Sequence, residues 1–260
     1  MNNSKRGFVL VIILSVILVL VIVAGTIKER YDNKKSDEEY AAYMQEVDSE
    51  EVVKSPNNSE EEVDSSKVKG CINKLKAKQD IKVLILGDDM AMSKGRTSDS
   101  GIWSDGFKHL IETTYGSKVN LTLLAKEGAT LETGLRATKE NDISDYDLAI
   151  LCYGNNDAKT SRKISDVKEN YAEIVKNIKA KSPEALMIAI LESSLELNNA
   201  YRMAIIESAD SNSLIKVDMR EAFNSSGKKE AAISKNGFPN DTGYQIYTQT
   251  LGNKIKKAME

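Results

Sequence analysis

The pattern of hydrophobic and polar residues divides the chain into three parts. An apolar run occupies residues 7–27, a polar stretch fills residues 28–66, and alternating apolar and amphipathic segments follow over residues 67–260. The apolar run holds 21 uncharged residues. A helix that rises about 1.5 Å per residue needs about that length to cross the hydrocarbon of a bilayer, and a helix is the only single segment that satisfies its own backbone there. We therefore predict a transmembrane helix over residues 7–27.

The charges around this run predict its orientation. Lys5 and Arg6 precede it, which predicts that residues 1–6 lie in the cytoplasm and the C-terminal domain lies outside the cell. Lys28 and Arg30 follow the run and reduce the difference in positive charge between its two ends. A cleaved signal peptide is the alternative, but its apolar core is usually only about 7–15 residues long. No cysteine follows the run closely, which excludes a lipoprotein anchor. We expect a single-pass membrane protein with an uncleaved signal anchor.

The polar stretch predicts a disordered, charged stalk over residues 28–66. Large apolar residues are few in it, and the sequence of residues 49–66 is SEEVVKSPNNSEEEVDSS with one letter per residue. Such a composition does not bury enough surface to offset the entropy lost on ordering. The basic, mildly amphipathic residues 67–78 predict a short helix that leads into the globular domain, which we assign to residues 67–260.

Five short apolar runs in the globular part alternate with amphipathic segments. The runs are continuous rather than alternating, as is typical of strands buried on both faces: residues 81–86, 119–125, 147–153, 185–191 and 213–218. Helices are predicted between them and after the last, near residues 102–115, 131–139, 163–181, 196–210 and 242–259. This repeated strand–helix order predicts a flavodoxin-like three-layer α/β/α domain with a five-stranded parallel sheet.

Composition narrows the classes of partner. The net charge of −3 gives no broad basic face, so we predict no nucleic-acid partner. The two cysteines, Cys71 and Cys152, are too few for a disulfide framework or a zinc site, although one disulfide between them stays open. We expect no cofactor and no bound metal.

Four polar blocks follow predicted strands or open the last helix, where ligands of parallel α/β folds bind. They are residues 87–90 (GDDM), 127–130 (EGAT), 154–157 (GNND) and 236–244 (NGFPNDTGY). In this order they resemble the G-D-S-L block, the glycine block, the G-x-N-D block and the D-x-x-H-P block of the SGNH/GDSL hydrolases. Trp103, the run LESS at residues 191–194, and residues 240–244 also look like a branch of that family from Gram-positive bacteria.

The resemblance implies a fold that cleaves esters with a serine nucleophile, a histidine base, an orienting aspartate and donors for the oxyanion. The donor positions are retained at Gly128 and Asn156. Asp89 stands at the position of the serine, Lys235 at that of the aspartate and Phe238 at that of the histidine.

Two further residues bear on the missing base. If one residue is deleted in the last block, Asn236 aligns with the aspartate instead of Lys235. The single histidine of the chain, His109, falls in the first predicted helix of the domain, where a packed or surface role is expected. Losing nucleophile, base and orienting group together removes the family's mechanism, so hydrolysis by it is not expected.

Three functions are compatible with these residues. The first, which we favour, is an extracytoplasmic pseudo-esterase on the cell membrane that binds a cell-surface glycan or partner, with Asp88, Gly154 and Asp157 among the pocket residues. The second is an active carbohydrate esterase or acylhydrolase that uses Asp89 as nucleophile, or a divalent cation gathered by Asp88, Asp89 and Asp157. The third is a ligand-free scaffold that presents its surface to other membrane proteins.

Overall fold

The computed structural model describes residues 70–196 and 198–260. The predicted anchor at residues 7–27 and the predicted stalk at residues 28–66 lie outside these ranges, as do residues 67–69 of the predicted leading helix. Among the described residues, no helix combines the length and the apolar character needed to cross a bilayer. The membrane anchor therefore stays a prediction from the sequence.

A five-stranded sheet forms the centre of the domain, in the order β2-β1-β3-β4-β5. All neighbouring strands are parallel, with Val83 of β1 paired to Leu121 of β2 on one side and to Leu148 of β3 on the other. This confirms the predicted flavodoxin-like sheet. The strands are β1 (Ile81–Gly87), β2 (Val119–Ala125), β3 (Leu148–Cys152), β4 (Leu186–Leu191) and β5 (Ile215–Asp218).

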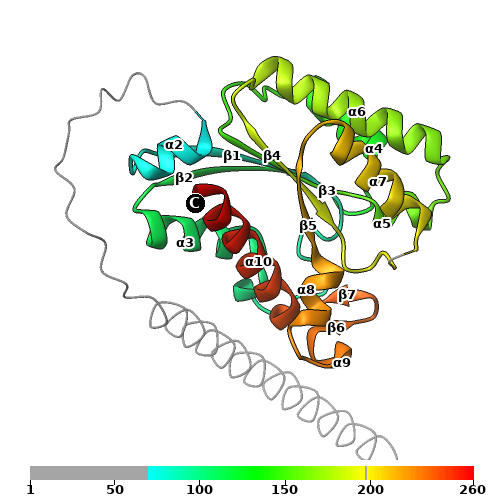
Figure 1. Cartoon of the computed structure of the whole chain (residues 1–260). Helices are drawn as coiled ribbons and strands as arrows, with labels where there is room; N and C mark the ends of the chain where they lie inside the picture. Colours follow the sequence, from blue (N-terminus) through cyan, green and yellow to red (C-terminus); the bar gives the residue numbers. More distant parts are fainter. Residues whose placement is uncertain (1–69, 197) are drawn as a thin grey trace, which may run out of the picture. The chain divides into compact units, whose positions relative to one another are not determined.

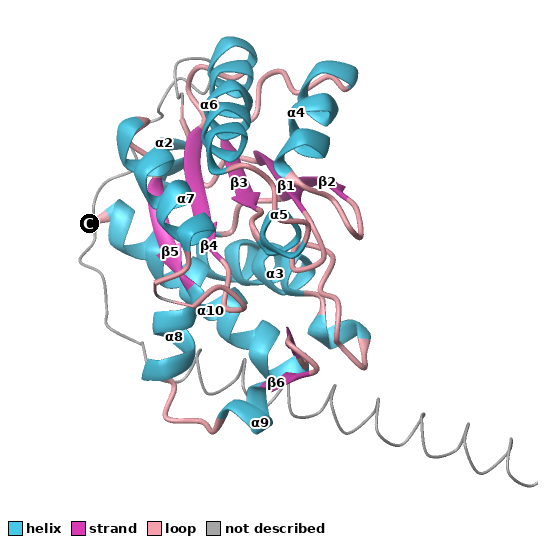
Figure 2. Ribbon diagram, turned by 90° about the vertical axis from the view of Figure 1, so that its right-hand side faces the viewer, coloured by secondary structure: helices cyan, strands magenta, loops and turns pink. Residues whose placement is uncertain are grey.

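Helices cover both faces of the sheet (Figures 1 and 2). One layer contains α2 (Cys71–Lys76), α3 (Trp103–Tyr115) and α10 (Asp241–Met259). The other contains α4 (Leu131–Glu140), α6 (Ile164–Lys181) and α7 (Ala200–Ser211). Successive side chains of a strand point to opposite faces, so Val83 and Ile85 pack into the core under the first layer, and Leu84 and Leu86 into the core under the second.

The apolar spacing on the helices explains why they dock in this way. On α6, the residues at i, i+4, i+7, i+8 and i+11 are all buried, namely Val167, Tyr171, Ile174, Val175 and Ile178. On α10, Tyr244, Tyr247 and Leu251 are fully buried, as expected for core residues. Trp103 opens α3, is buried, and donates from Nε1 to the Met90 carbonyl at 2.8 Å, which anchors the helix to the loop after β1.

Several predicted boundaries were wrong by a few residues, among them those of α7 and β5. Helix α7 begins at Ala200 rather than near residue 196, because the Asn199 side chain caps it by accepting bonds from the amides of Tyr201 and Arg202. Strand β5 begins at Ile215 rather than at residue 213, where Ser213 adopts a positive φ of 61°.

Several short elements at the carboxyl end of the sheet were not predicted. They are η2 (Asp99–Gly101), α5 (Asn155–Lys159), α8 (Met219–Ser225), α9 (Glu230–Ile233) and the antiparallel pair β6 (Ser234–Lys235) and β7 (Phe238–Pro239). In Figure 1, α8, α9, β6 and β7 lie together beyond the end of β5. Both cysteines are buried and unbonded, so the disulfide left open by the sequence is absent.

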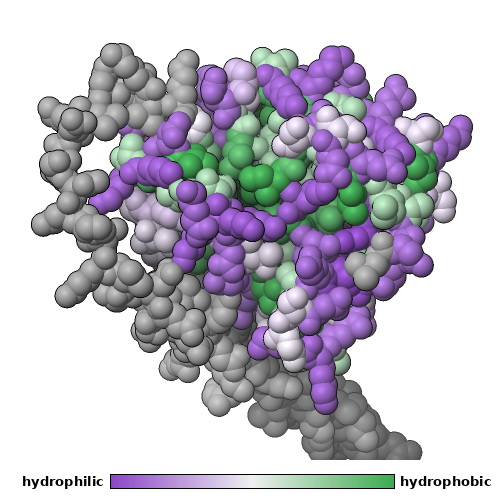
Figure 3. Space-filling view, in the orientation of Figure 1, coloured by the Kyte–Doolittle hydropathy of each residue, from purple (hydrophilic) through white to green (hydrophobic). Residues whose placement is uncertain are grey.

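The surface is mixed in character. On the face shown in Figure 3, hydrophobic residues gather in the middle, where the sheet lies between its two helical layers, and hydrophilic residues surround them. Large hydrophobic side chains that are well exposed in the described part of the chain are Met92, Leu123 and Met203. They come from separate elements, so they do not by themselves define a docking surface.

Candidate functional site

The end of β1 places two consecutive aspartates at the carboxyl edge of the sheet. Gly87 precedes them, and a Cβ there would lie 2.2 Å from Ala91 Cβ and 2.8 Å from the Cys152 carbonyl oxygen, so only glycine fits. The Asp88 amide then donates to the Cys152 carbonyl at 3.1 Å. This contact turns the chain so that the side chains of Asp88 and Asp89 enter different surroundings.

Asp88 lies in the interior beside a second carboxyl group. Its Oδ1 accepts the Met90 amide at 2.9 Å, while Oδ2 meets no N–H or O–H donor among the described residues and faces Glu192 instead. Glu192, which follows β4 and is also fully buried, accepts the Asn155 amide at 2.7 Å. Burial, followed by the neighbouring Glu192 carboxyl, raises the pKa of Asp88 well above its usual range. We therefore expect the two carboxyl groups to share a proton in the interior of the domain.

Asp89 occupies the edge of the site and binds the retained glycine. The Gly128 amide donates to Asp89 Oδ1 at 2.8 Å, and the Asp89 side chain is 3% exposed. Gly128 has φ of 75°, a conformation that favours glycine and points its N–H at the end of β1. The amide that the family resemblance assigns to an oxyanion is thus engaged by a carboxylate of the chain itself.

Lys94 contacts the same carboxylate from the loop after β1. Its Nζ lies 3.8 Å from Asp89 Oδ2, pairs with Glu127, and lies 5.0 Å from the centre of the Phe238 ring. The hydrogen bond to Glu127 raises the pKa of Lys94, with Asp89 adding to the shift. A permanently protonated lysine does not serve as a base.

Lys235 and Phe238, at the orienting-group and base positions, are paired across a tight hairpin. Strands β6 and β7 are joined by Asn236 and Gly237, both with positive φ (55° and 79°), as in a type I′ turn. Lys235 is exposed, whereas Phe238 is half-buried with Lys94 Nζ and Lys159 Nζ (4.5 Å from the ring centre) near its ring. An apolar ring between two cations therefore occupies the region where the resemblance implies a base.

The loop after β1 and the start of α10 hold this arrangement together. Asp241 accepts the Thr97 amide at 2.8 Å, and the Tyr244 hydroxyl donates to the Lys94 carbonyl at 2.7 Å. A Cβ at Gly95 would lie 2.7 Å from Phe238 Cβ, so the loop and the hairpin touch through their backbones. These contacts join residues more than 140 positions apart, so no local pattern in the sequence predicts them.

The block at residues 154–157 is used for internal contacts as well. Asn156 donates from Nδ2 to the Ala129 carbonyl at 3.1 Å, not to Asp89. Both carboxylate oxygens of Asp157 accept the Leu131 amide at 3.2 Å, at the start of α4. Gly154 has φ of 134°, and a Cβ there would lie 2.6 Å from Ile205 Cδ1. The predicted pocket residues Gly154 and Asp157 thus support the neighbouring helices, and Asp157 also lines a small cavity beside Arg162.

Other candidate chemistry can be placed. His109 is exposed on α3, and it is not among the side chains that contact Asp89. In the part of the chain that the structure describes, no three aspartate, glutamate, cysteine or histidine side chains come close enough to hold a metal ion together. Asp88, Asp89 and Asp157 each bind different partners, so the cation site considered from the sequence does not form in this structure.

Fold and site together define a parallel three-layer α/β protein whose polar blocks lie at the carboxyl ends of the strands, with Asp89 held by the Gly128 amide. The sequence profile of the GDSL-like lipase/acylhydrolase family matches residues 85–246, and the chain belongs to this family. No curated protein matches the chain.

Solved structures with the same fold are esterases of low sequence identity. A two-domain esterase active on acetylated mannans has a TM-score of 0.61 at 14% identity, and the match covers 73% of this chain but only 54% of that one. The lipase/acylhydrolase from Enterococcus faecalis has a TM-score of 0.52 at 17% identity, over 69% of this chain and 97% of that one. Axe2, an acetylxylan esterase from Geobacillus stearothermophilus, has a TM-score of 0.52 at 18% identity, over 67% of this chain and 94% of that one. At these identities the likeness shows the fold.

Proposed function

We propose that this protein is a membrane-anchored, extracytoplasmic member of the family that binds a cell-surface glycan and does not hydrolyse esters. The observation that carries the proposal is the engagement of Asp89. Its carboxylate accepts the Gly128 amide at 2.8 Å and lies 3.8 Å from Lys94 Nζ. A negative charge at this place repels the anion that develops during acyl transfer, and the donor meant for that anion is already bound.

The replacement of the base supports the same conclusion. Phe238 has no titratable group, and Lys94 beside it is held protonated by Glu127 and Asp89. A nucleophilic carboxylate still requires an acid to assist the leaving group and a base to activate water in the second step. Among the described residues, the side chain of Asp89 contacts the Gly128 amide, which has no proton acceptor, and Lys94, whose pKa is raised.

Two arguments support glycan binding: the substrates of structurally similar esterases and the predicted location of the domain. Two of the structural neighbours act on acetylated mannans or acetylxylan, so their folds accommodate polysaccharide chains. The apolar run at residues 7–27 places the domain at the cell surface by the sequence argument given above. A domain of this fold that still binds polysaccharide but no longer hydrolyses esters would act as a glycan-binding domain.

The proposal is tested by measuring turnover and binding on the same full-length protein in detergent. With 4-nitrophenyl acetate, we expect the wild type and Asp89→Ala to hydrolyse no faster than buffer, and the wild type to be retained on insoluble cell-wall polysaccharide. Hydrolysis that disappears in Asp89→Ala would replace the proposal with an enzyme that uses Asp89. Hydrolysis that survives this change would also refute it, and would reject Asp89 as the nucleophile.

A further inference from the structure

The amino edge of the sheet, opposite the Asp89 site, carries a group of lysines that we call the lysine face. It is formed by α2 and its link to β1, the turn from α3 into β2, and the last turns of α10, which lie beside α2 in Figure 1. The two loops adjoin, because the Ile81 amide donates to the Lys118 carbonyl at 2.9 Å. A Cβ at Gly116 would also lie 3.9 Å from Lys78 Cδ. The exposed or half-buried lysines of this face are Lys76, Lys78, Lys118, Lys254 and Lys257.

The charge of the lysine face is only partly balanced by acidic groups. In the part of the chain that the structure describes, none of these five lysines forms an ion pair, whereas Lys74 of α2 pairs with Asp147 at 2.7 Å. The acidic residues of the same segments are Asp80, Glu112 and Glu260. The face is therefore net positive in a chain whose total charge is −3.

Helix geometry explains some of these lysines but not all. Lys76 and Lys257 lie in the last turns of their helices, where a cation complements the helix dipole. Lys78 and Lys118 lie outside the helices, so the dipole gives no reason for them. Both are exposed and enlarge the same positive surface from two separate loops.

The place where the chain enters the domain indicates the partner of this face. Gly70 directly precedes α2, and Lys67 and Lys69 come just before it in the sequence. About 40 residues separate Gly70 from the proposed anchor at residues 7–27, and a flexible chain of that length spans roughly 30–40 Å. The anchor therefore keeps this face within reach of the lipid headgroups.

From these observations we infer that the lysine face docks on anionic phospholipid headgroups of the membrane that holds the anchor. The inference rests on the anchor in the proposed function and adds the orientation of the domain to it. Each lysine near an anionic surface favours the docked state about five-fold, and the attraction acts over about 8 Å at physiological salt. Docking in this way turns the carboxyl edge of the sheet, with Asp89, away from the bilayer.

Energy transfer to labelled lipid headgroups measures this docking. The full-length protein is inserted into nanodiscs of phosphatidylcholine with or without phosphatidylglycerol, and a donor dye is attached at Thr114→Cys near the lysine face or at Ala231→Cys at the opposite edge. Both positions are exposed, whereas Cys71 and Cys152 are buried. We expect more transfer from position 114 than from position 231, and more in anionic discs than in neutral ones. Raising the salt from 0.1 M to 1 M shortens the screening length from about 10 Å to about 3 Å and should remove the difference between the lipids.

Two triple variants test whether the lysines are responsible. The first has glutamine at three positions of the lysine face, Lys76→Gln, Lys78→Gln and Lys118→Gln. Its ratio of docked to free domain should fall about 100-fold, so transfer in anionic discs should fall to the level of neutral discs.

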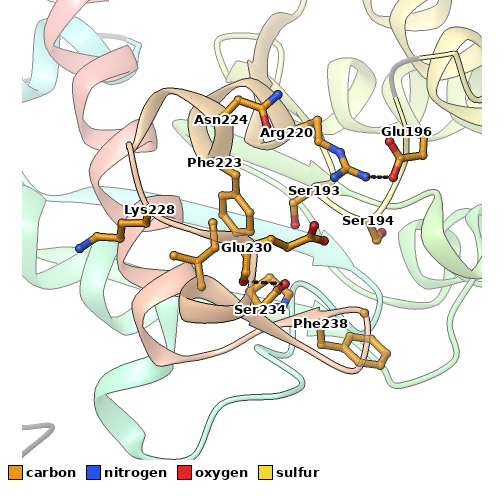
Figure 4. A pocket seen from close by; sticks show the side chains of 13 residues that line it. Ser193, Ser194, Glu196, Arg220, Phe223, Asn224, Lys228, Glu230, Ser234 and Phe238 are labelled. Atoms are coloured by element: carbon orange, nitrogen blue, oxygen red, sulfur yellow. Dashed lines mark hydrogen bonds and ion pairs between the residues drawn. The ribbon is translucent and has the colours of Figure 1, made fainter.

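The matched control removes three exposed lysines at the opposite edge, Lys163→Gln, Lys228→Gln and Lys229→Gln. Figure 4 shows the Lys228 side chain pointing away from the neighbouring pocket. The control should transfer energy as the wild type does, and circular dichroism melting curves check that both variants are folded.

The possible failures can be told apart. Equal transfer from position 114 in neutral and anionic discs that contain the protein would overturn the inference and leave the proposed function standing. This result is also the one expected if the acidic residues 49–66 cover the lysines in place of lipid. An effect of phosphatidylglycerol that survives in the lysine-face variant would assign docking to another surface and overturn the inference as well. A full-length protein that does not insert into the discs would refute the anchor itself, and with it the inference.

Discussion

Asp88 and Asp89 are neighbours in the chain but lie in different surroundings, and the difference decides what each can do. Asp89 is buried and meets the Gly128 amide and a half-exposed lysine, Lys94. Asp88 lies in the interior against Glu192, where two carboxylates close together cannot both stay ionised. Residue type alone therefore misleads, because one buried aspartate accepts a backbone amide beside a lysine and the other lies against a second carboxyl group.

The shared proton of Asp88 and Glu192 predicts how stability depends on pH. Burial raises the pKa of both groups, so the folded protein keeps a proton that the unfolded chain releases above about pH 4. Because the native state then binds more protons, the free energy of unfolding falls as pH rises, by up to about 1.4 kcal/mol per pH unit. The contribution is fully present below about pH 4 and is lost as pH rises toward the raised pKa.

Urea unfolding between pH 4 and pH 8 measures this effect. Asp88→Asn retains an acceptor for the Met90 amide and supplies a donor to Glu192, so its unfolding free energy should fall less steeply over this range than that of the wild type. Asp80→Asn changes an exposed carboxylate and should leave the slope as it is. Equal slopes in the wild type and Asp88→Asn would refute the shared proton.

At the scale of elements, the hairpin β6–β7 determines what stands opposite Asp89. It presses against the loop after β1 at Gly95, which has φ of 98° and leaves no room for a side chain. Gly116, at the end of α3, also has a positive φ of 69°, but there the nearest atom to an added Cβ is 3.9 Å away. The two glycines share a conformational requirement and differ in the space around them.

This pair predicts a difference in stability. Gly116→Ala should cost about 1 kcal/mol, the conformational cost of a positive φ for alanine. Gly95→Ala adds a clash with Phe238 and the Pro239 carbonyl, so it should cost about 1–3 kcal/mol more and displace the hairpin. Denaturant unfolding of both variants measures the costs, and limited proteolysis detects the displaced hairpin. Equal costs would show that the loop and hairpin are not in contact.

The elements of the sheet and its covering helices could be predicted because each carries its own pattern. Continuous apolar runs such as residues 81–86 mark buried strands, and the spacing on α6 marks a docked helix face. The hairpin was missed although Asn236-Gly237 is a strong turn signal, since strands of two residues show no alternation. Lys94 was missed because its partners are Asp89, Glu127 and Phe238, two of them far along the chain and joined to it only by the fold.

At the scale of the whole molecule, the family's fold is retained while its polar groups are redistributed. The strand-end blocks at residues 87–90 and 154–157 brace loops and helices through Asp88, Asn156 and Asp157. A sheet of this topology brings many loops to one edge, so a ligand site can move to the adjacent loops without any change in strand order. This is why the family membership and the proposed loss of hydrolysis are compatible.

The location of the domain outside the cell depends on the apolar run at residues 7–27, and this run leads to a final prediction. The full-length protein, tagged at its C-terminus and produced in a Gram-positive host, should pellet with membranes and resist extraction with sodium carbonate, because the transfer of about 20 apolar residues into hydrocarbon is effectively irreversible. Protease added to protoplasts should digest the domain, since Lys5 and Arg6 favour a cytoplasmic N-terminus. A variant without residues 7–27 should be soluble and protected inside the protoplast. Recovery of the wild-type domain from the medium, with a new N-terminus just after the apolar run, would establish a cleaved signal peptide and refute the anchor.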